Sequence, residues 1–134
     1  MPPDRHGRTL RAMGHYRKLK AWEHAQKLAL ESSRAARRFP DYEQTVLADQ
    51  LRRACYSIPL NVAEGASRKG NREFRRYLDI ARASLAELET IVDLSHDLGY
   101  IDNPTHARLT ALATETGKTM YGLLRKVSAA AEKS

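Results

Sequence analysis

Residues 71–98 read NREFRRYLDIARASLAELETIVDLSHDL, and this stretch decides the fold class. Apolar side chains recur in it every three or four residues, which is the spacing of one face of an α-helix. That face comprises Phe74, Leu78, Ala81, Leu85, Leu88 and Val92. An adjoining face comprises Tyr77, Ser84, Ile91 and Leu98. We expect Asn71 to cap the start of this helix and Gly99 to end it.

The segment before this helix has the same periodicity over residues 41–64. Asp41 is expected to cap its start, and Gly65 to form its C-cap. Pro59 lies inside the pattern, where a proline removes one backbone hydrogen bond. The apolar stripe continues in phase across Pro59, which predicts a kink and not a break.

Two more helices flank this pair. The first covers residues 19–38 and ends at Phe39, because a residue that precedes a proline avoids the helical conformation. The last begins near Asn103, which is expected to cap it, with Pro104 in its first position.

The connections between these helices are short, about two to six residues, so that neighbouring helices must be antiparallel. The sequence therefore predicts an all-α, antiparallel, up-down-up-down four-helix bundle over residues 16–134. Residues 1–15 are polar and basic and contain proline and glycine, which predicts a flexible basic N-terminal arm.

Composition narrows the cellular context. A chain of 134 residues suits one domain. Its single cysteine, Cys55, cannot form an intramolecular disulfide, which fits a reducing compartment. The chain has no run of 18 apolar residues, and its basic N-terminus lacks the apolar stretch of a secretory signal. We therefore expect a cytoplasmic protein that does not span a membrane.

Metal and catalytic motifs are absent from the sequence. A di-iron site in a bundle needs Glu-x-x-His on two helices, and the chain offers only Asp93-x-x-His96. One cysteine cannot build a thiolate zinc site. Ser57, Ser84 and Cys55 lie on predicted helices without a histidine within a few residues. We therefore expect no catalytic residue, no metal, no cofactor and no enzymatic activity.

Asn61 and Glu64 are polar residues beside the apolar stripe that contains Pro59. A buried asparagine must be hydrogen-bonded. We expect Asn61 to be mostly buried, and both side chains to bond backbone groups around the Pro59 kink and the following turn. A structural role is favoured over a catalytic one for both.

Positive charge gathers in three segments that an up-down-up-down bundle brings to one end. The formal net charge of the chain is +7, whereas residues 1–20, 65–76 and 122–134 together carry +11. Clustered lysine and arginine suit the phosphates of nucleic acid. The candidate phosphate-binding residues are Arg11, Arg17, Lys18, Lys20, Arg68, Lys69, Arg72, Arg75 and Arg76. The alternative is a solvated end that keeps the protein soluble. His15 and Tyr16 are too few for a stacking platform near the arm.

The second and third predicted helices carry a familiar pattern. It comprises QLRRA at 50–54, SIPLNVAEG at 57–65, Glu73-Phe74, Tyr77-Leu78 and ARASLAELE at 81–89, with LKAW at 19–22, Phe39-Pro40 and LGYI at 98–101. Together these resemble the bacterial four-helix-bundle family named for proteins encoded in 23S rRNA intervening sequences. The resemblance covers roughly residues 16–127.

This resemblance implies a bundle that assembles into a ring-shaped homopentamer with no established enzymatic activity. The family is similar to the accessory variability determinant proteins of diversity-generating retroelements, which are basic pentamers that bind nucleic acid. The favoured hypothesis is a ring-forming protein that binds DNA or RNA non-specifically, and the alternative is a structural or protein-interaction module without a nucleic-acid role. A third hypothesis, an enzyme, would require a deep pocket with converging titratable groups. The pattern has no counterpart to the N-terminal arm.

Overall fold

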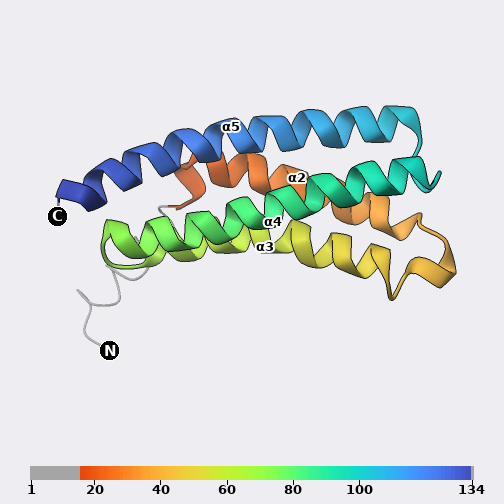
Figure 1. Ribbon diagram of the computed structural model, residues 1–134, viewed down its shortest axis with the longest axis horizontal. Coiled ribbons are helices and arrows are strands. Elements are labelled where there is room, and N and C mark those ends of the chain that lie inside the picture. Colours follow the sequence, from red (N-terminus) through yellow and green to blue (C-terminus); the bar gives the residue numbers. More distant parts are fainter. Residues whose placement is uncertain (1–15, 134) are drawn as a thin grey trace.

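The computed structural model describes residues 16–133, which form a bundle of four long helices (Figure 1). The elements are η1 (Tyr16–Lys18), α2 (Lys20–Arg37), η2 (Asp41–Glu43), α3 (Leu47–Ser67), α4 (Asn71–Asp97) and α5 (Asn103–Lys133). The predicted all-α four-helix bundle is confirmed. The predicted arm over residues 1–15, together with Ser134, lies outside the described residues, so the boundary at residue 16 stays a prediction.

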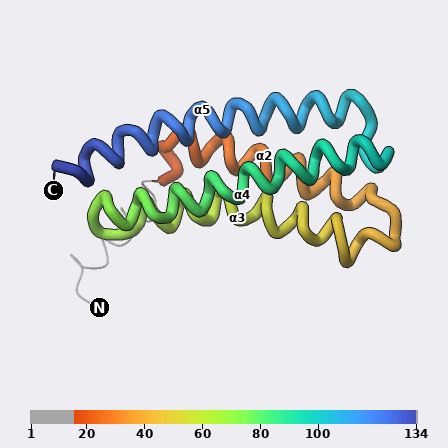
Figure 2. The backbone as a smooth tube through the Cα atoms, viewed as in Figure 1, coloured from red at the N-terminus to blue at the C-terminus, as the bar shows by residue number. Residues whose placement is uncertain are grey.

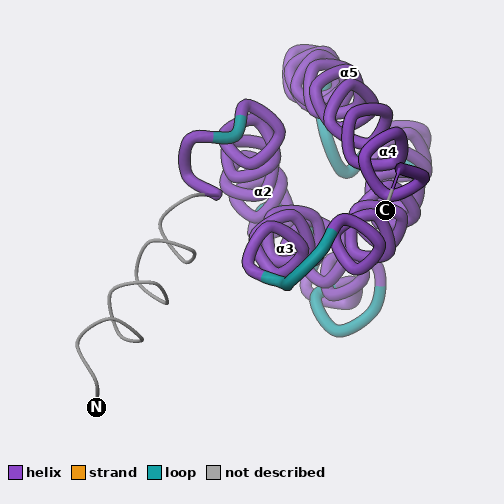
Figure 3. Tube along the Cα trace, turned by 90° about the vertical axis from the view of Figure 1, so that its left-hand side faces the viewer, coloured by secondary structure: helices purple, strands orange, loops and turns teal. Residues whose placement is uncertain are grey.

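The four helices surround one core. Each packs against its neighbour in sequence, and α5 packs back against α2. The backbones of the diagonal pairs, α2 with α4 and α3 with α5, do not approach each other closely within residues 16–133. Viewed from one end, the helices occupy four corners (Figure 3). Their connections alternate between the two ends of the bundle, which makes successive helices antiparallel (Figure 2).

The core consists of the apolar faces that the periodicity predicted. On α4, the side chains of Leu78, Leu85, Leu88 and Val92 are buried, and Phe74 packs partly buried against them. Each fully buried side chain of this size contributes about 1.5–3 kcal/mol through removal of apolar surface from water. None of the helices in the described part of the chain is both long enough and apolar enough to cross a bilayer.

The start of the second long helix differs from the prediction. The helix α3 begins at Leu47, and Asp41 instead opens the short η2 turn. The amide of Gln44 explains the interruption, because its Nε2 donates to the carbonyls of Ala36 and Phe39 at 2.9 and 3.0 Å. Within residues 41–46, Gln44 therefore satisfies backbone carbonyls at the end of α2, and α3 begins only after this segment.

Gly65 is not a C-cap, which corrects the prediction. It lies inside α3, which continues to Ser67, and it is buried. A Cβ atom at this position would lie 2.8 Å from the Cβ of Tyr77 and 2.9 Å from Cδ1 of Phe74. The absence of a side chain at Gly65 is thus what lets α3 and α4 approach each other closely here.

The residues before α4 and α5 also differ by one position from the predicted caps. Asn71 is the first residue of α4, preceded by Gly70 with a φ of 84°, and no side chain caps this helix. Asp102, and not Asn103, caps α5, because its Oδ1 accepts a hydrogen bond from the backbone N–H of Thr105 at 2.9 Å. Hydrogen bonds to Thr105 lower the pKa of Asp102 below its ordinary value.

Candidate functional site

Three basic segments lie at the same end of the bundle. The start of α2, the connection from α3 to α4, and the C-terminal part of α5 all lie toward the left in Figure 1. We call this the basic end; its described cationic residues are Arg17, Lys18, Lys20, Arg68, Lys69, Arg72, Arg75, Arg76, Arg125, Lys126 and Lys133. Arg11 lies outside the described residues. The structure therefore brings together the segments that the sequence pattern placed at one end.

The cations of the first segment are separated from those of α4. The η1 turn, which carries Arg17 and Lys18, packs against α2 and α3, and its backbone does not come close to that of α4 in the described part of the chain. The guanidinium of Arg17 lies 5.3 Å from the ring centroid of Tyr16. Lys20 forms an exposed ion pair of 3.6 Å with Glu23. Positive charge is thus present on both sides of the end of α3.

Two arginines at the basic end are held in place around Tyr77. Arg68 donates from Nη2 to Glu64 at 2.7 Å and to the Tyr77 hydroxyl at 2.9 Å. Arg76 donates from Nε to Glu73 at 3.0 Å. The guanidinium carbons of Arg68 and Arg76 lie 5.2 and 4.5 Å from the centroid of the Tyr77 ring. One aromatic ring therefore positions two cations.

These contacts favour the charged forms of Glu73, Arg68 and Arg76. The hydrogen bond from Arg76 lowers the pKa of Glu73 below its ordinary value. Glu73 and Glu64 in turn raise the pKa values of Arg76 and Arg68, chiefly through the same hydrogen bonds. Two of the positive charges at this end are therefore paired with carboxylates.

Lys69, Arg72 and Arg75 have no such partner. None of them forms an ion pair with another residue in 16–133. They flank the first turn of α4, where no side chain caps the helix and the first intrahelical bond runs from Phe74 N–H to the Gly70 carbonyl at 3.3 Å. Unpaired cations beside open backbone N–H groups form a surface that attracts anions such as phosphate.

The polar residues around Pro59 form a link between α3 and α4. The helix α3 is continuous through the buried Pro59. Asn61 is half-buried, less than predicted, and its amide donates to the backbone carbonyl and the hydroxyl of Ser57 at 2.8 and 2.9 Å. The Ser57 hydroxyl lies 2.7 Å from that of Ser84. The backbone bond predicted for Asn61 is present, and it belongs to a structural link.

Glu64 departs from its prediction. Its carboxylate is exposed and bonds the side chain of Arg68, and it makes no backbone contact among the described residues. The spacing explains this outcome, because residues four apart on a helix lie on the same face and a Glu–Arg pair at that spacing attracts.

Asp93 and His96 do not form a shared site. His106 bonds Asp93 at 2.9 Å, while His96 bonds the amide oxygen of Asn103 at 2.7 Å. The two imidazole rings stack with centroids 4.1 Å apart. In the part of the chain that the structure describes, no three histidine, cysteine, aspartate or glutamate side chains are placed to hold a metal ion.

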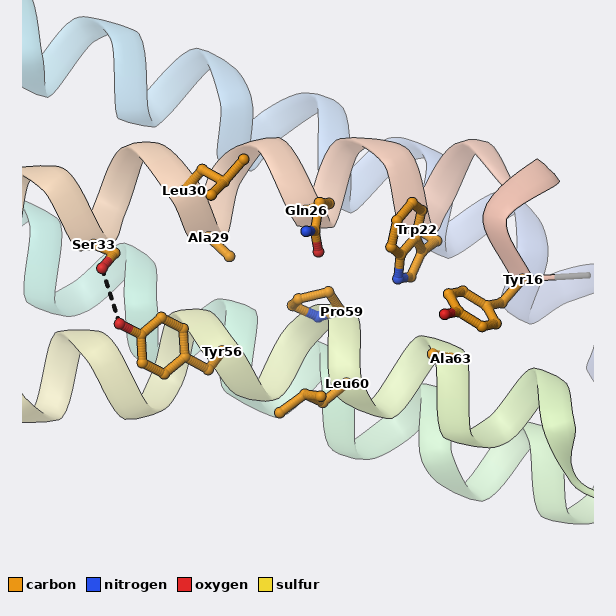
Figure 4. Close-up of a pocket in the computed structure, with 10 residues that line it drawn as sticks. All are labelled: Tyr16, Trp22, Gln26, Ala29, Leu30, Ser33, Tyr56, Pro59, Leu60 and Ala63. Atoms are coloured by element: carbon orange, nitrogen blue, oxygen red, sulfur yellow. Dashed lines mark hydrogen bonds between the residues drawn. The ribbon is translucent and has the colours of Figure 1, made fainter. Parts of the chain in front are cut away.

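The structure also contains an aromatic groove that the sequence pattern did not predict. It lies between α2 and α3, has a volume of about 480 Å³ and is lined by Tyr16, Trp22, Gln26, Ala29, Leu30, Ser33, Tyr56, Pro59, Leu60 and Ala63 (Figure 4). Tyr56, Leu60 and Ala63 share one face of α3, and that apolar stripe outside the core face was the available signal. The aromatic rings come from different elements, so no local motif contains them.

Comparison with known proteins gives one result at the level of family. No curated protein sequence matches this chain. Residues 17–122 match the family model described as 23S rRNA-intervening sequence protein. This match covers most of the bundle, from η1 to the C-terminal half of α5. The chain therefore belongs to the 23S rRNA-intervening sequence protein family.

Proposed function

We propose that this protein binds nucleic acid through its phosphates, without sequence preference and without catalysis, as a ring of identical subunits. The observation that carries the proposal is the pair of unpartnered arginines, Arg72 and Arg75, beside the uncapped start of α4. Arg68 and Arg76 are paired with carboxylates and would have to break these ion pairs before binding a phosphate. Arg72, Arg75 and Lys69 have no ion pair to break among the described residues.

Assembly into a ring strengthens this proposal, and the surface of α4 supports it. Ile80 and Leu94 of α4, and Leu98 directly after it, are 39, 46 and 50% exposed, which leaves apolar side chains along the outside of this helix and at its end. Covering them by a neighbouring subunit would remove that surface from water. In a homopentamer, as the family resemblance implies, the basic end would occur five times, and contacts of one strand with several subunits would reinforce one another.

The test is a titration of fluorescently labelled single-stranded and duplex DNA and RNA at several salt concentrations, followed by anisotropy. Affinity should fall steeply with salt, because each neutralised phosphate releases counterions. The double variant Arg72→Gln/Arg75→Gln should weaken binding to all sequences alike and reduce the salt slope by about 2. Neither arginine has an ion pair to lose, so the fold should be unchanged.

A matched control separates local from general charge effects. Arg37 and Arg82 are exposed, form no ion pair with another described residue and lie outside the basic end. The variant Arg37→Gln/Arg82→Gln removes the same charge and should retain nearly all binding. No binding at low salt would refute the proposal and favour a protein-interaction module. A monomeric mass in light scattering at micromolar concentration would refute the ring.

A further inference from the structure

The groove between α2 and α3 has an aromatic end that adjoins the basic end. Tyr16 and Trp22 form an edge-to-face pair with ring centroids 5.2 Å apart and an interplanar angle of 68°. Figure 4 shows both rings beside Ala63, at one end of the groove. Tyr56 lies at the opposite end, where its hydroxyl bonds that of Ser33 at 2.9 Å. The groove is thus bounded by aromatic rings at both ends.

Between these rings the groove offers both apolar contact and hydrogen-bonding groups. Leu60 and Tyr56, which line its α3 side, remain 66 and 44% exposed, so this side of the groove is open to a ligand. The exposed amide of Gln26 points between the helices and makes no side-chain hydrogen bond with another described residue. A planar group with polar edges suits such a lining, because rings contact its faces while the amide donates and accepts at its edge.

Positive charge lies next to the groove. The Arg17 guanidinium lies over the ring of Tyr16, which lines the groove. Lys18 follows Arg17 in the same η1 turn. A strand whose base entered the groove would therefore place a neighbouring phosphate near the cations of η1 at the basic end.

We propose that the groove binds a base of single-stranded nucleic acid, stacked against its aromatic rings, while the flanking phosphates lie on the basic end. This inference rests on the proposed function and adds to it a preference for unpaired strands. Apolar lining alone would also suit a second copy of the chain. The unbonded amide and the adjacent cations favour a base attached to a phosphate chain, because both would lose hydration without compensation under an apolar subunit surface.

The only tryptophan in the chain, Trp22, reports directly on this groove. The experiment titrates the full-length protein with a short oligothymidylate and with an abasic oligodeoxyribose phosphate of the same length and charge. The oligothymidylate should quench the fluorescence of Trp22 and bind about fivefold to a hundredfold more tightly than the abasic strand. A duplex of the same length should leave the fluorescence unchanged.

The variant Tyr56→Ala should remove most of this difference and leave binding of the abasic strand intact. Its control is Tyr42→Ala, which removes a tyrosine that is 71% exposed and lies outside the groove. Equal affinity for the two strands, without quenching, would overturn the groove site while leaving the phosphate-binding proposal standing. Failure of both strands to bind would overturn both. Dissociation of an oligomer by Tyr56→Ala or Leu60→Glu would identify the groove as a subunit contact and also overturn this inference.

Discussion

Replacing Gly65 by alanine tests the packing of α3 against α4 at the basic end. In a helix interior this change ordinarily stabilises by about 1 kcal/mol, since glycine has the lower helix propensity. At Gly65 the new Cβ would lie 2.8 Å from the Cβ of Tyr77 and 3.2 Å from the carbonyl oxygen of Phe74. Neither atom can rotate away, so the helices must separate. Overpacking costs about 1–3 kcal/mol, and contacts this short place the site in the upper half of that range. We expect the free energy of unfolding to fall by about 1–2 kcal/mol.

Gly122→Ala is the matched control. Gly122 lies inside α5 and is exposed, and a Cβ added to it would have no neighbouring atom within 4 Å. The same change there should raise the free energy of unfolding by about 1 kcal/mol through helix propensity alone. Urea denaturation followed by far-UV circular dichroism measures both. A Gly65→Ala protein at least as stable as the wild type, beside a stabilised Gly122→Ala protein, would refute the close-approach explanation.

Two further predictions concern buried polar groups. The hydroxyls of Ser32 and Ser95 are buried without a hydrogen-bond partner among the described residues, so Ser32→Ala and Ser95→Ala should each stabilise by about 1 kcal/mol in thermal denaturation. The control Ser57→Ala loses a hydrogen bond to Ser84 and should destabilise the protein. A lower melting temperature for Ser32→Ala or Ser95→Ala would contradict the reasoning. Burial raises the pKa of the Cys55 thiol to about 12, so a thiol reagent at neutral pH should modify it slowly until urea unfolds the protein. Rapid labelling of the folded protein would contradict this.

The sequence predicted the helices better than their ends. The apolar period of residues 71–98 located α4 to within one residue, because that signal is local and long. The predicted start of α3 was wrong. It depends on Gln44, whose side-chain amide donates to the carbonyls of Ala36 and Phe39 on the other side of a turn. Gly65 was misassigned for a related reason. A glycine near a helix end is typical of both a cap and a close approach, and only the packing of α4 distinguishes them.

The sequence predicted where the basic segments lie; their role as a binding site stays a prediction. Alternating helix directions sufficed to place the basic segments at one end. The ion pairs of Arg68 and Arg76 were not predicted, although the i, i+4 and i, i+3 spacings to Glu64 and Glu73 were a signal for them. The groove was not predictable in this way. Its rings come from η1, α2 and α3, and their proximity depends on how these elements pack, which no local pattern encodes.

Tyr77 connects the packing of the bundle to the charge of its basic end. Its Cβ lies at the α3–α4 crossing against Gly65, while its ring and hydroxyl hold Arg68 and Arg76. The distance between the helices at Gly65 therefore also sets the positions of two guanidinium groups. Gly65→Ala removes no charge, yet by displacing Tyr77 it should move both arginines relative to Arg72. Reduced phosphate binding by a folded Gly65→Ala protein would thus reflect the arrangement of the cations, since their number is unchanged.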